Sequence, residues 1–470
     1  DDLKKAWKEE KKVLASWREP KGYDQYGGYK LAGWKEKATG FFRVVKRNGF
    51  WWLISPEGNP CFYLGLDTAP NLVGNSTPVS DREFLFEWLP SKEGIYKECW
   101  ARGVWGTSVS DEYVSFDTAN LIRKYGDDWK KIATDLTKER LKKWGFSGVG
   151  KWGGIPEMSY LPVLRRGDVP KIVQHPDIFD SNVEDKFKES IRRQIEAKKN
   201  NPFVVGWSLG NESDEIIKKD EIKKIMEMGP NVPIKKALID YALKEIYKGD
   251  IEALAKSWKL EGKKEEIYEK KPIPPDNDIE KMRIFYAEEY YKFIYKTVKE
   301  IDPNHLYFGF WIVPRGWESE DDWRVSVKYC DVIGYDFYSF EFMPDWLKKL
   351  VEETGKPIIL GEFSFPAFYD GKRGFGCYRS AAKDDADSGQ LYTKWMKDAA
   401  NNPYCVGVSW HFYRDQPVTG RGPGRGEDLV YGEYFAIGMV DVGDRPKWDL
   451  VRKAREANLS AIKWRLKAGH

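Results

Sequence analysis

The stretch Asn201-Pro-Phe-Val-Val-Gly-Trp-Ser-Leu-Gly-Asn-Glu212 decides how the rest of the chain is interpreted. It is a short apolar run that ends in Gly, Asn and Glu, and a second run, Pro357-Ile-Ile-Leu-Gly-Glu362, has the same form far downstream. Continuous short apolar runs are typical of parallel strands that are buried on both faces. In an α/β barrel, the carboxyl ends of such strands carry the chemistry. The two runs therefore predict two strands that deliver a glutamate each to one end of a barrel.

The composition favours a single large globular domain. A length of 470 residues fits one (β/α)8 barrel with insertions. With 41% hydrophobic residues and no apolar run long enough for a membrane span, no membrane association is expected. Lys plus Arg (77) nearly balance Asp plus Glu (74), which argues against nucleic acid as a partner. The 32% of charged residues, many of them Lys and Glu, favour a heat-adapted, thermophilic surface.

The cysteines and histidines indicate neither a disulfide framework nor a metal site, and no cofactor is expected. The five cysteines are odd in number and lack a Cys-x-x-Cys pair, so buried free thiols are predicted. They are Cys61, Cys99, Cys330, Cys377 and Cys405. The N-terminal residues have neither Met nor an apolar signal segment, which leaves open both a secreted chain with its signal removed and a cytoplasmic one. No pattern indicates an oligomeric state.

The order of elements predicts a (β/α)8 TIM barrel with an N-terminal β-hairpin and a long helical insertion after strand 4. Residues 1–40 are expected to form a helix (2–17) and a loop packed on the barrel, and residues 41–470 to form the barrel, with the insertion at about 214–280. The hairpin spans 41–60 and turns at Asn48-Gly49. Residues 68–130 are expected to form a long loop.

The barrel strands are expected at 61–67, within 144–152, at 161–164 or 171–174, and at 201–212, 305–313, 331–338, 358–362 and 406–411. Further helices are expected at 129–143, from Ser181 as cap to about 200, from Asp278 as cap to 301, and at 448–466.

Two carboxylates at strand ends suggest hydrolysis of a glycosidic bond. Cleavage requires a proton on the leaving oxygen and an anion beneath the oxocarbenium ion, which two carboxyl groups of different pKa can supply. Glu212 is predicted to be the proton donor and Glu362 the anion that attacks the anomeric carbon, while Asn211 binds a substrate hydroxyl. A retaining mechanism predicts carboxyl groups roughly 5 to 5.5 Å apart.

The Gly-Asn-Glu at the fourth strand and the Gly-Glu at the seventh resemble the clan A glycoside hydrolases, which are retaining enzymes on a (β/α)8 barrel. This resemblance implies that Glu212 is the acid/base and Glu362 the nucleophile. Within the clan, Gly49-Phe-Trp-Trp-Leu-Ile-Ser-Pro-Glu-Gly-Asn-Pro60 and the following Tyr63-Leu-Gly-Leu resemble the family 50 β-agarases.

Further segments carry the same resemblance. His175-Pro-Asp-Ile-Phe-Asp-Ser181 and Ile437-Gly-Met-Val-Asp-Val-Gly-Asp-Arg-Pro446 look like further matches to family 50, so the likeness covers most of residues 41–450. Tyr335-Asp-Phe-Tyr338 is similar to the Trp-Asp-x-Tyr of the family 42 β-galactosidases.

Other side chains at strand ends are candidates for substrate binding. Tyr335 and Tyr338 could hold the nucleophile by a hydrogen bond, or could be part of the barrel wall. Trp410 resembles the clan's sugar platform, and we favour this role over core packing. The remaining candidates are Asp67, Lys151 and Trp152, which could bind hydroxyls or form a salt bridge, and His411, which could contact substrate.

The sequence therefore predicts a retaining β-glycoside hydrolase that acts on a β-linked glucan or galactan and resembles the agarases. A transglycosylase on the same scaffold would share every residue named above. A non-catalytic carbohydrate-binding barrel is the alternative from a different class, and it would be expected to have lost one carboxylate.

Overall fold

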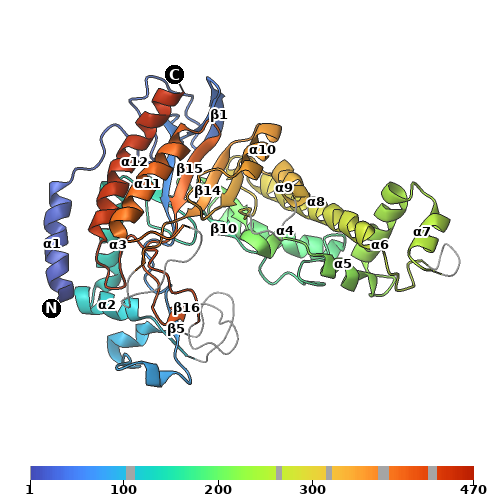
Figure 1. Ribbon diagram of the computed structural model, residues 1–470, viewed down its shortest axis with the longest axis horizontal. Helices are drawn as coiled ribbons and strands as arrows, with labels where there is room; N and C mark the ends of the chain where they lie inside the picture. Colours follow the sequence, from blue (N-terminus) through green and yellow to red (C-terminus); the bar gives the residue numbers. More distant parts are fainter. Residues whose placement is uncertain are drawn as a thin grey trace. The chain divides into compact units, whose positions relative to one another are not determined.

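The structure is a computed structural model that describes residues 2–101, 112–260, 267–313, 320–368, 380–421 and 431–469. The chain divides into two compact units. The larger unit comprises Asp1–Leu161, Asp336–Pro344 and Pro357–His470, and the smaller comprises Pro162–Tyr335 and Asp345–Lys356. Both units contain α-helices and short parallel strands, so the fold is of the mixed α/β class (Figure 1).

The chain opens with a helix and a β-hairpin, as the sequence predicts. The elements are α1 (Asp2–Ser16), β1 (Arg43–Arg47), β2 (Phe50–Ile54) and β3 (Pro60–Cys61). β1 and β2 are antiparallel, and Asn48 and Gly49 between them have φ angles of 49° and 80°. A tight hairpin turn requires two left-handed residues, and Asn-Gly adopts this conformation at little cost. β3 pairs with β2 and leads into the first parallel strand.

Five parallel strands form the central sheet of the larger unit. In spatial order they are β14 (Ile358–Phe363), β15 (Cys405–Trp410), β4 (Tyr63–Leu66), β8 (Gly148–Val149) and β9 (Ser159–Tyr160). Every residue of the first four strands is buried, which explains why their side chains are apolar or small apart from Glu362 in β14. Parallel strands present their carboxyl ends at one edge of a sheet, so polar residues that end or follow these strands are brought together there.

The described part of the larger unit contains four longer helices besides α1. They are α2 (Phe116–Tyr125), α3 (Trp129–Lys143), α11 (Asp385–Asn401) and α12 (Trp448–Ala468). α11 lies along α12 and also packs on β15 (Figure 1). The prediction that 68–130 is a loop is wrong for α2, whose N-cap Ser115 accepts a hydrogen bond from the backbone N–H of Thr118. A small antiparallel sheet of β5 (Thr77–Pro78), β7 (Tyr113–Val114) and β6 (Trp100–Ala101) also lies in this segment.

The smaller unit has its own parallel strands, β10 (Val163–Leu164), β11 (Gly206–Leu209) and β12 (Leu306–Tyr307), paired in this order. β13 (Ile333–Asp336) follows in the chain, and its Tyr335 forms a parallel bridge with Ile312. The third barrel strand was predicted at 161–164 or at 171–174. The first position is the one observed, because β10 lies within 161–164 and no strand is described at 171–174.

The segment 214–280 is largely helical in its described part, as predicted, and 261–266 lie outside the described residues. It contains α5 (Lys219–Met226), α6 (Pro233–Tyr241), the π-helix η4 (Ala242–Ile246), α7 (Ile251–Ser257) and the start of α8 (Asp276–Ile301). The other helices of this unit are α4 (Ser181–Glu196), α9 (Glu320–Ser326) and α10 (Asp345–Thr354). α8 serves as the support of the unit, since α4, α5, α6 and α9 all pack against it (Figure 1).

Two predicted helix caps are wrong by a few residues. α4 is capped by Asp180, whose carboxylate accepts hydrogen bonds from the backbone N–H groups of Asn182 and Val183, rather than by Ser181. α8 begins after Pro275 instead of at Asp278. Asp278 lies buried in the first turn, and its carboxylate accepts a hydrogen bond from the indole N–H of Trp258 instead of capping the helix. Both acidic residues still lie where the helix dipole favours negative charge.

The cysteine prediction is confirmed for Cys61, Cys99, Cys330 and Cys405, which are buried free thiols, while Cys377 lies outside the described residues. None of the helices in the described ranges combines the length and the apolar character that crossing a bilayer requires.

Candidate active site

Glu362 lies in β14 near its carboxyl end, and its carboxylate is held by groups on both oxygens. On one side, Nζ of Lys151 lies 2.9 Å from Oε1, and the indole N–H of Trp152 points to the same oxygen at 3.4 Å. On the other side, the hydroxyl of Tyr338 donates to Oε2 at 2.5 Å, and Nδ1 of His411 lies 3.7 Å from Oε2. The side chain is only 7% exposed, so these contacts largely replace its hydration.

Lys151 lies two residues after the end of β8 and is completely buried. Its ammonium contacts two carboxylates, since it donates to Oδ2 of Asp336 at 2.6 Å as well as lying against Glu362. A buried ammonium is tolerated only when it is paired with negative charge, and here two carboxylates supply it. The sequence left two roles open for Lys151, a salt bridge or the binding of a substrate hydroxyl. In the structure Lys151 forms the salt bridge.

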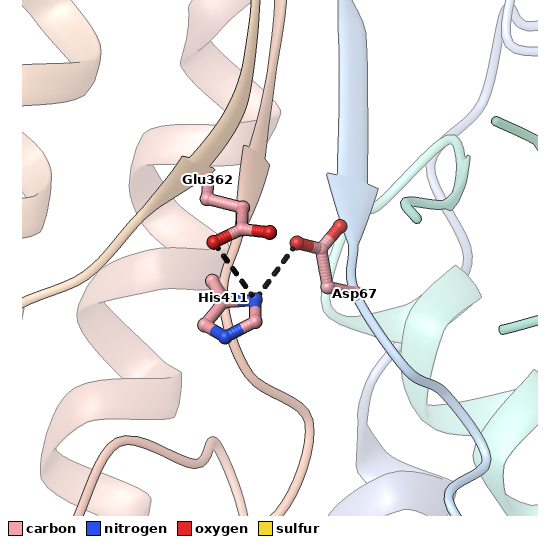
Figure 2. Close-up of side chains that lie close together, drawn as sticks. All are labelled: Asp67, Glu362 and His411. Carbon is pink, nitrogen blue, oxygen red and sulfur yellow. Dashed lines mark hydrogen bonds and ion pairs between the residues drawn. The ribbon is translucent and has the colours of Figure 1, made fainter. Parts of the chain in front are cut away.

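Asp67 and His411 complete the cluster. They follow the last residues of β4 and β15, two paired strands that lie between β14 and β8 in the sheet. Figure 2 shows Nδ1 of His411 between the carboxylates of Glu362 and Asp67, with Oδ2 of Asp67 at 3.1 Å. The other oxygen of Asp67 accepts a hydrogen bond from the backbone N–H of Lys151 at 2.8 Å. A Cβ on Gly150 would lie 1.8 Å from this oxygen, so glycine is required next to Lys151.

The charges in this cluster set the ionisation of its members. Burial would raise the pKa of Glu362, but the positive charges of His411 and Lys151 and the Tyr338 hydrogen bond hold that pKa well below its usual range. Burial would lower the pKa of His411, yet the negative charge of Glu362 and the hydrogen bond to Asp67 raise it above its usual value. Burial raises the pKa of Asp67 to about 6, against the opposing effect of His411.

An ionised carboxylate fixed in this way can act as a nucleophile or stabilise a developing positive charge. The cluster could also hold a cation, since the ligand atoms of Asp67, Glu362 and His411 lie within 4.8 Å of one another. The ammonium of Lys151 and the raised pKa of His411 oppose the binding of a further positive charge there. The arrangement therefore fits acid–base and nucleophilic chemistry better than metal binding.

The two tryptophans named as candidates have opposite environments. Trp410 is 1% exposed and packs against Phe363 and Tyr392, and its indole N–H donates to the carbonyl of Ile437. Its environment is that of a core residue rather than the sugar platform that we favoured. Trp152 is 42% exposed beside Glu362, and its φ of 63° is in the left-handed region. An exposed indole next to a reactive carboxylate offers a face on which a sugar ring can stack.

The remaining candidates belong to the smaller unit. Asn211 and Glu212 follow β11, and Glu212 opens a single 3₁₀ turn, η3 (Glu212–Glu215). Glu212 is partly exposed, and its backbone N–H donates to the carbonyl of Phe310 at 2.8 Å. Tyr335 is fully buried within β13.

Sequence reasoning missed Asp336 and Gly150. Asp336 lies within the motif Tyr335-Asp-Phe-Tyr338, but its partner Lys151 is 185 positions away. Gly150 carries no chemistry of its own, and the Gly-Val-Gly-Lys run at 148–151 is the only signal that could have indicated a close approach there.

Comparison with known proteins relates this chain to agarases. No protein-family model matches the sequence. Beta-agarase B of Vibrio sp. (strain JT0107) is 28% identical over 519 residues, a match that covers 99% of this chain and 53% of that protein. The chain thus spans about half the length of this curated relative.

Solved structures extend the likeness to the fold. An exo-β-agarase structure superposes with a TM-score of 0.83 at 26% identity, covering 99% of this chain and 70% of that one. A second agarase structure gives a TM-score of 0.83 at 25% identity with the same two coverages. The resemblance to β-agarases inferred from the sequence is therefore supported in both sequence and fold along almost the whole chain.

Proposed function

We propose that this chain is a β-glycoside hydrolase that cleaves agarose by double displacement, with Glu362 as nucleophile and Glu212 as acid/base. The observation that carries the proposal is the Glu362 carboxylate, which is buried and held by four groups at the carboxyl end of a parallel sheet. The names of the similar proteins indicate agarose as the substrate. These roles are those of the clan A retaining hydrolases, and the likeness of 335–338 to family 42 is consistent with them.

In the proposed reaction, Glu362 attacks the anomeric carbon while Glu212 gives its proton to the leaving oxygen. Water, deprotonated by Glu212, then releases the sugar from Glu362. Tyr338 and Lys151 hold the attacking carboxylate in one orientation, and Trp152 provides a stacking face for the sugar beside it. Asn211, next to Glu212, binds a substrate hydroxyl. No step requires a cofactor.

We further propose a (β/α)8 barrel in residues 41–470, with the helical segment at 214–280 inserted after the fourth strand and residues 1–40 packed on its outside. In such a barrel the last strand pairs with the first, and consecutive strands are neighbours. The parallel pairing of β15 with β4 supports the proposal, and so do the runs β4-β8-β9 and β10-β11-β12.

Incubation with agarose tests the function. We expect soluble β-linked oligosaccharides whose first-formed reducing end keeps the β configuration, because two displacements at one carbon restore it. Products resolved by size together with ¹H NMR during the first minutes measure both points, and added sugar acceptors separate hydrolysis from transglycosylation. An α-configured first product would contradict double displacement. Failure to cleave any β-linked galactan or glucan would contradict the hydrolase assignment.

Replacement of Lys151 tests the charge on the nucleophile. Glu362 must be ionised to attack, and its lowered pKa keeps it ionised through the mildly acidic range. In Lys151→Met the lost cation raises that pKa, so activity at low pH is lost first. We expect the acidic limb of the kcat/KM profile to move up by about one pH unit. Asp336→Asn is the matched control, because it keeps the ammonium on Glu362 and is not expected to raise the limb. An unmoved limb in Lys151→Met would rule out this role.

A further inference from the structure

The turn that carries Glu212 has an unfavourable backbone conformation. Gly210 has a φ of 67°, and Glu212 itself has a φ of 51°. A left-handed conformation is strained for a non-glycine residue, and it persists only where the surroundings enforce it. Some group must therefore hold this turn in place. Among the described residues of the smaller unit, the side chain of Glu215 does so.

Glu215 ends the same 3₁₀ turn and lies buried beneath it. The side chain is 2% exposed. The hydroxyl of Tyr290 donates to its Oε2 at 2.8 Å, and Nε of Arg166 lies 3.6 Å from its Oε1. The hydroxyl of Tyr291 donates to the backbone carbonyl of Glu215 at 2.9 Å. Both tyrosines come from α8, so this helix anchors the end of the turn through the side chain and the backbone of one residue.

The carboxylate of Glu215 also closes the other end of the turn. A Cβ on Gly210 would lie 2.1 Å from its Oε1, which means that the carboxylate packs directly on the backbone two residues before Glu212. Arg166 reaches the same turn a second time, because Nη2 donates to the carbonyl of Asp214 at 3.4 Å. Glu215 therefore fixes the chain on both sides of Glu212. Its carboxylate packs on Gly210 before Glu212, and its own carbonyl after Glu212 is held by Tyr291.

We propose that Glu215 is the positioning residue for the proton donor Glu212, a role that rests on the proposed function. It holds the left-handed turn, and the turn directs the Glu212 carboxyl toward the leaving oxygen. Proton donation matters most when the leaving group is a poor one and little when it is a good one. Loss of positioning must therefore slow substrates in proportion to their need for a proton, whereas general loosening of the fold would slow all substrates alike.

The test uses Glu215→Gln and two aryl β-glycosides of the disaccharide released from agarose, one with phenol and one with 2,4-dinitrophenol as leaving group. Glutamine keeps the shape of the side chain, but it removes the negative charge beside Arg166 and replaces one of the two acceptor oxygens that face Arg166 and Tyr290 with an NH2 group. We expect kcat/KM for the phenyl glycoside, which reports the steps up to release of the leaving group, to fall roughly 10- to 100-fold, the scale of a small displacement of a catalytic group. For the dinitrophenyl glycoside we expect kcat/KM to change by no more than about twofold, since departure of this leaving group needs no proton and the later attack of water does not enter kcat/KM.

Two further variants keep the test decisive. Tyr290→Phe removes one donor from the Glu215 carboxylate and leaves the charge in place, so it should give the same selective loss to a smaller degree even if Glu215→Gln does not fold. Glu221→Gln is the matched control. Its carboxylate is also buried in this unit but pairs with His175 rather than with the turn, so it should lower stability without changing the ratio of the two rates.

The outcomes separate the inference from the function on which it rests. An equal loss on both glycosides, or no loss on either, would overturn the role of Glu215 and leave the hydrolase intact. A wild-type protein that cleaves neither glycoside nor agarose would overturn the proposed function, and the inference with it.

Discussion

Glu362→Gln is expected to reduce the turnover of agarose by a factor of about 10⁴ or more, the scale seen when the nucleophile of a covalent mechanism is removed. The amide is not a nucleophile toward the anomeric carbon, so the glycosyl intermediate does not form. The side chain keeps its size, and its single amide oxygen still accepts from one of the two donors, Tyr338 or Trp152, so the fold should survive. Reducing ends released from agarose measure the first effect, and circular dichroism measures the second. Turnover near that of the wild type would exclude Glu362 as the nucleophile.

A matched pair of alanine variants assigns the two carboxylates to their roles. With an activated aryl glycoside and added azide, Glu362→Ala should give the inverted α-glycosyl azide, because azide attacks in place of the missing nucleophile. Glu212→Ala should give the retained β-glycosyl azide, because azide attacks the glycosyl intermediate in place of water. Interchanged products would show that the two roles are reversed.

The fold was predictable from the sequence wherever burial on both faces dictates the residues. The apolar run before Glu362 indicated β14, and Asn48-Gly49 indicated the hairpin turn, since local chemistry decides both. α2 was not predicted, because it is only 10 residues long and buries two charged residues, Asp117 and Lys124, on its packed side. The caps of α4 and α8 were misplaced because several acidic or hydroxyl residues near each start could serve equally well by sequence.

The candidate site was less predictable, because its contacts join residues far apart in the chain. Tyr338 was found since it follows a strand end, but the pairing of Lys151 with Asp336 leaves no local signal. The burial of Trp410 could have been deduced. Adjacent residues of an extended chain point to opposite sides, and His411 directly follows Trp410, the last residue of β15, so the two side chains were expected to face different ways. His411 faces Glu362, and Trp410 faces Tyr392 of α11.

Arg140→Met is expected to lower the free energy of unfolding by about 3–5 kcal/mol, the usual effect of removing one partner from a buried ion pair. Arg140, on α3, is fully buried and forms two hydrogen bonds to the carboxylate of Glu10 on α1, at 2.6 and 2.8 Å. It also donates to Oδ1 of Asp444 at 2.8 Å and to the hydroxyl of Tyr413 at 2.7 Å. Urea unfolding of the variant and the wild type measures the loss.

The size of the effect follows from what the substitution leaves behind. Asp444 keeps a second cation, because Arg414 donates to the same oxygen, but Glu10 is left as a buried carboxylate without its guanidinium. Adding Glu10→Leu to Arg140→Met should therefore recover part of the loss, because two apolar side chains can replace a buried pair. Lys131→Met on the same helix is the control, since its pair with Asp135 is exposed to water and should leave the unfolding midpoint unchanged. If Arg140→Met unfolds at the wild-type midpoint, this buried network does not hold α1 to α3, and the apolar contacts of α1 must do so alone.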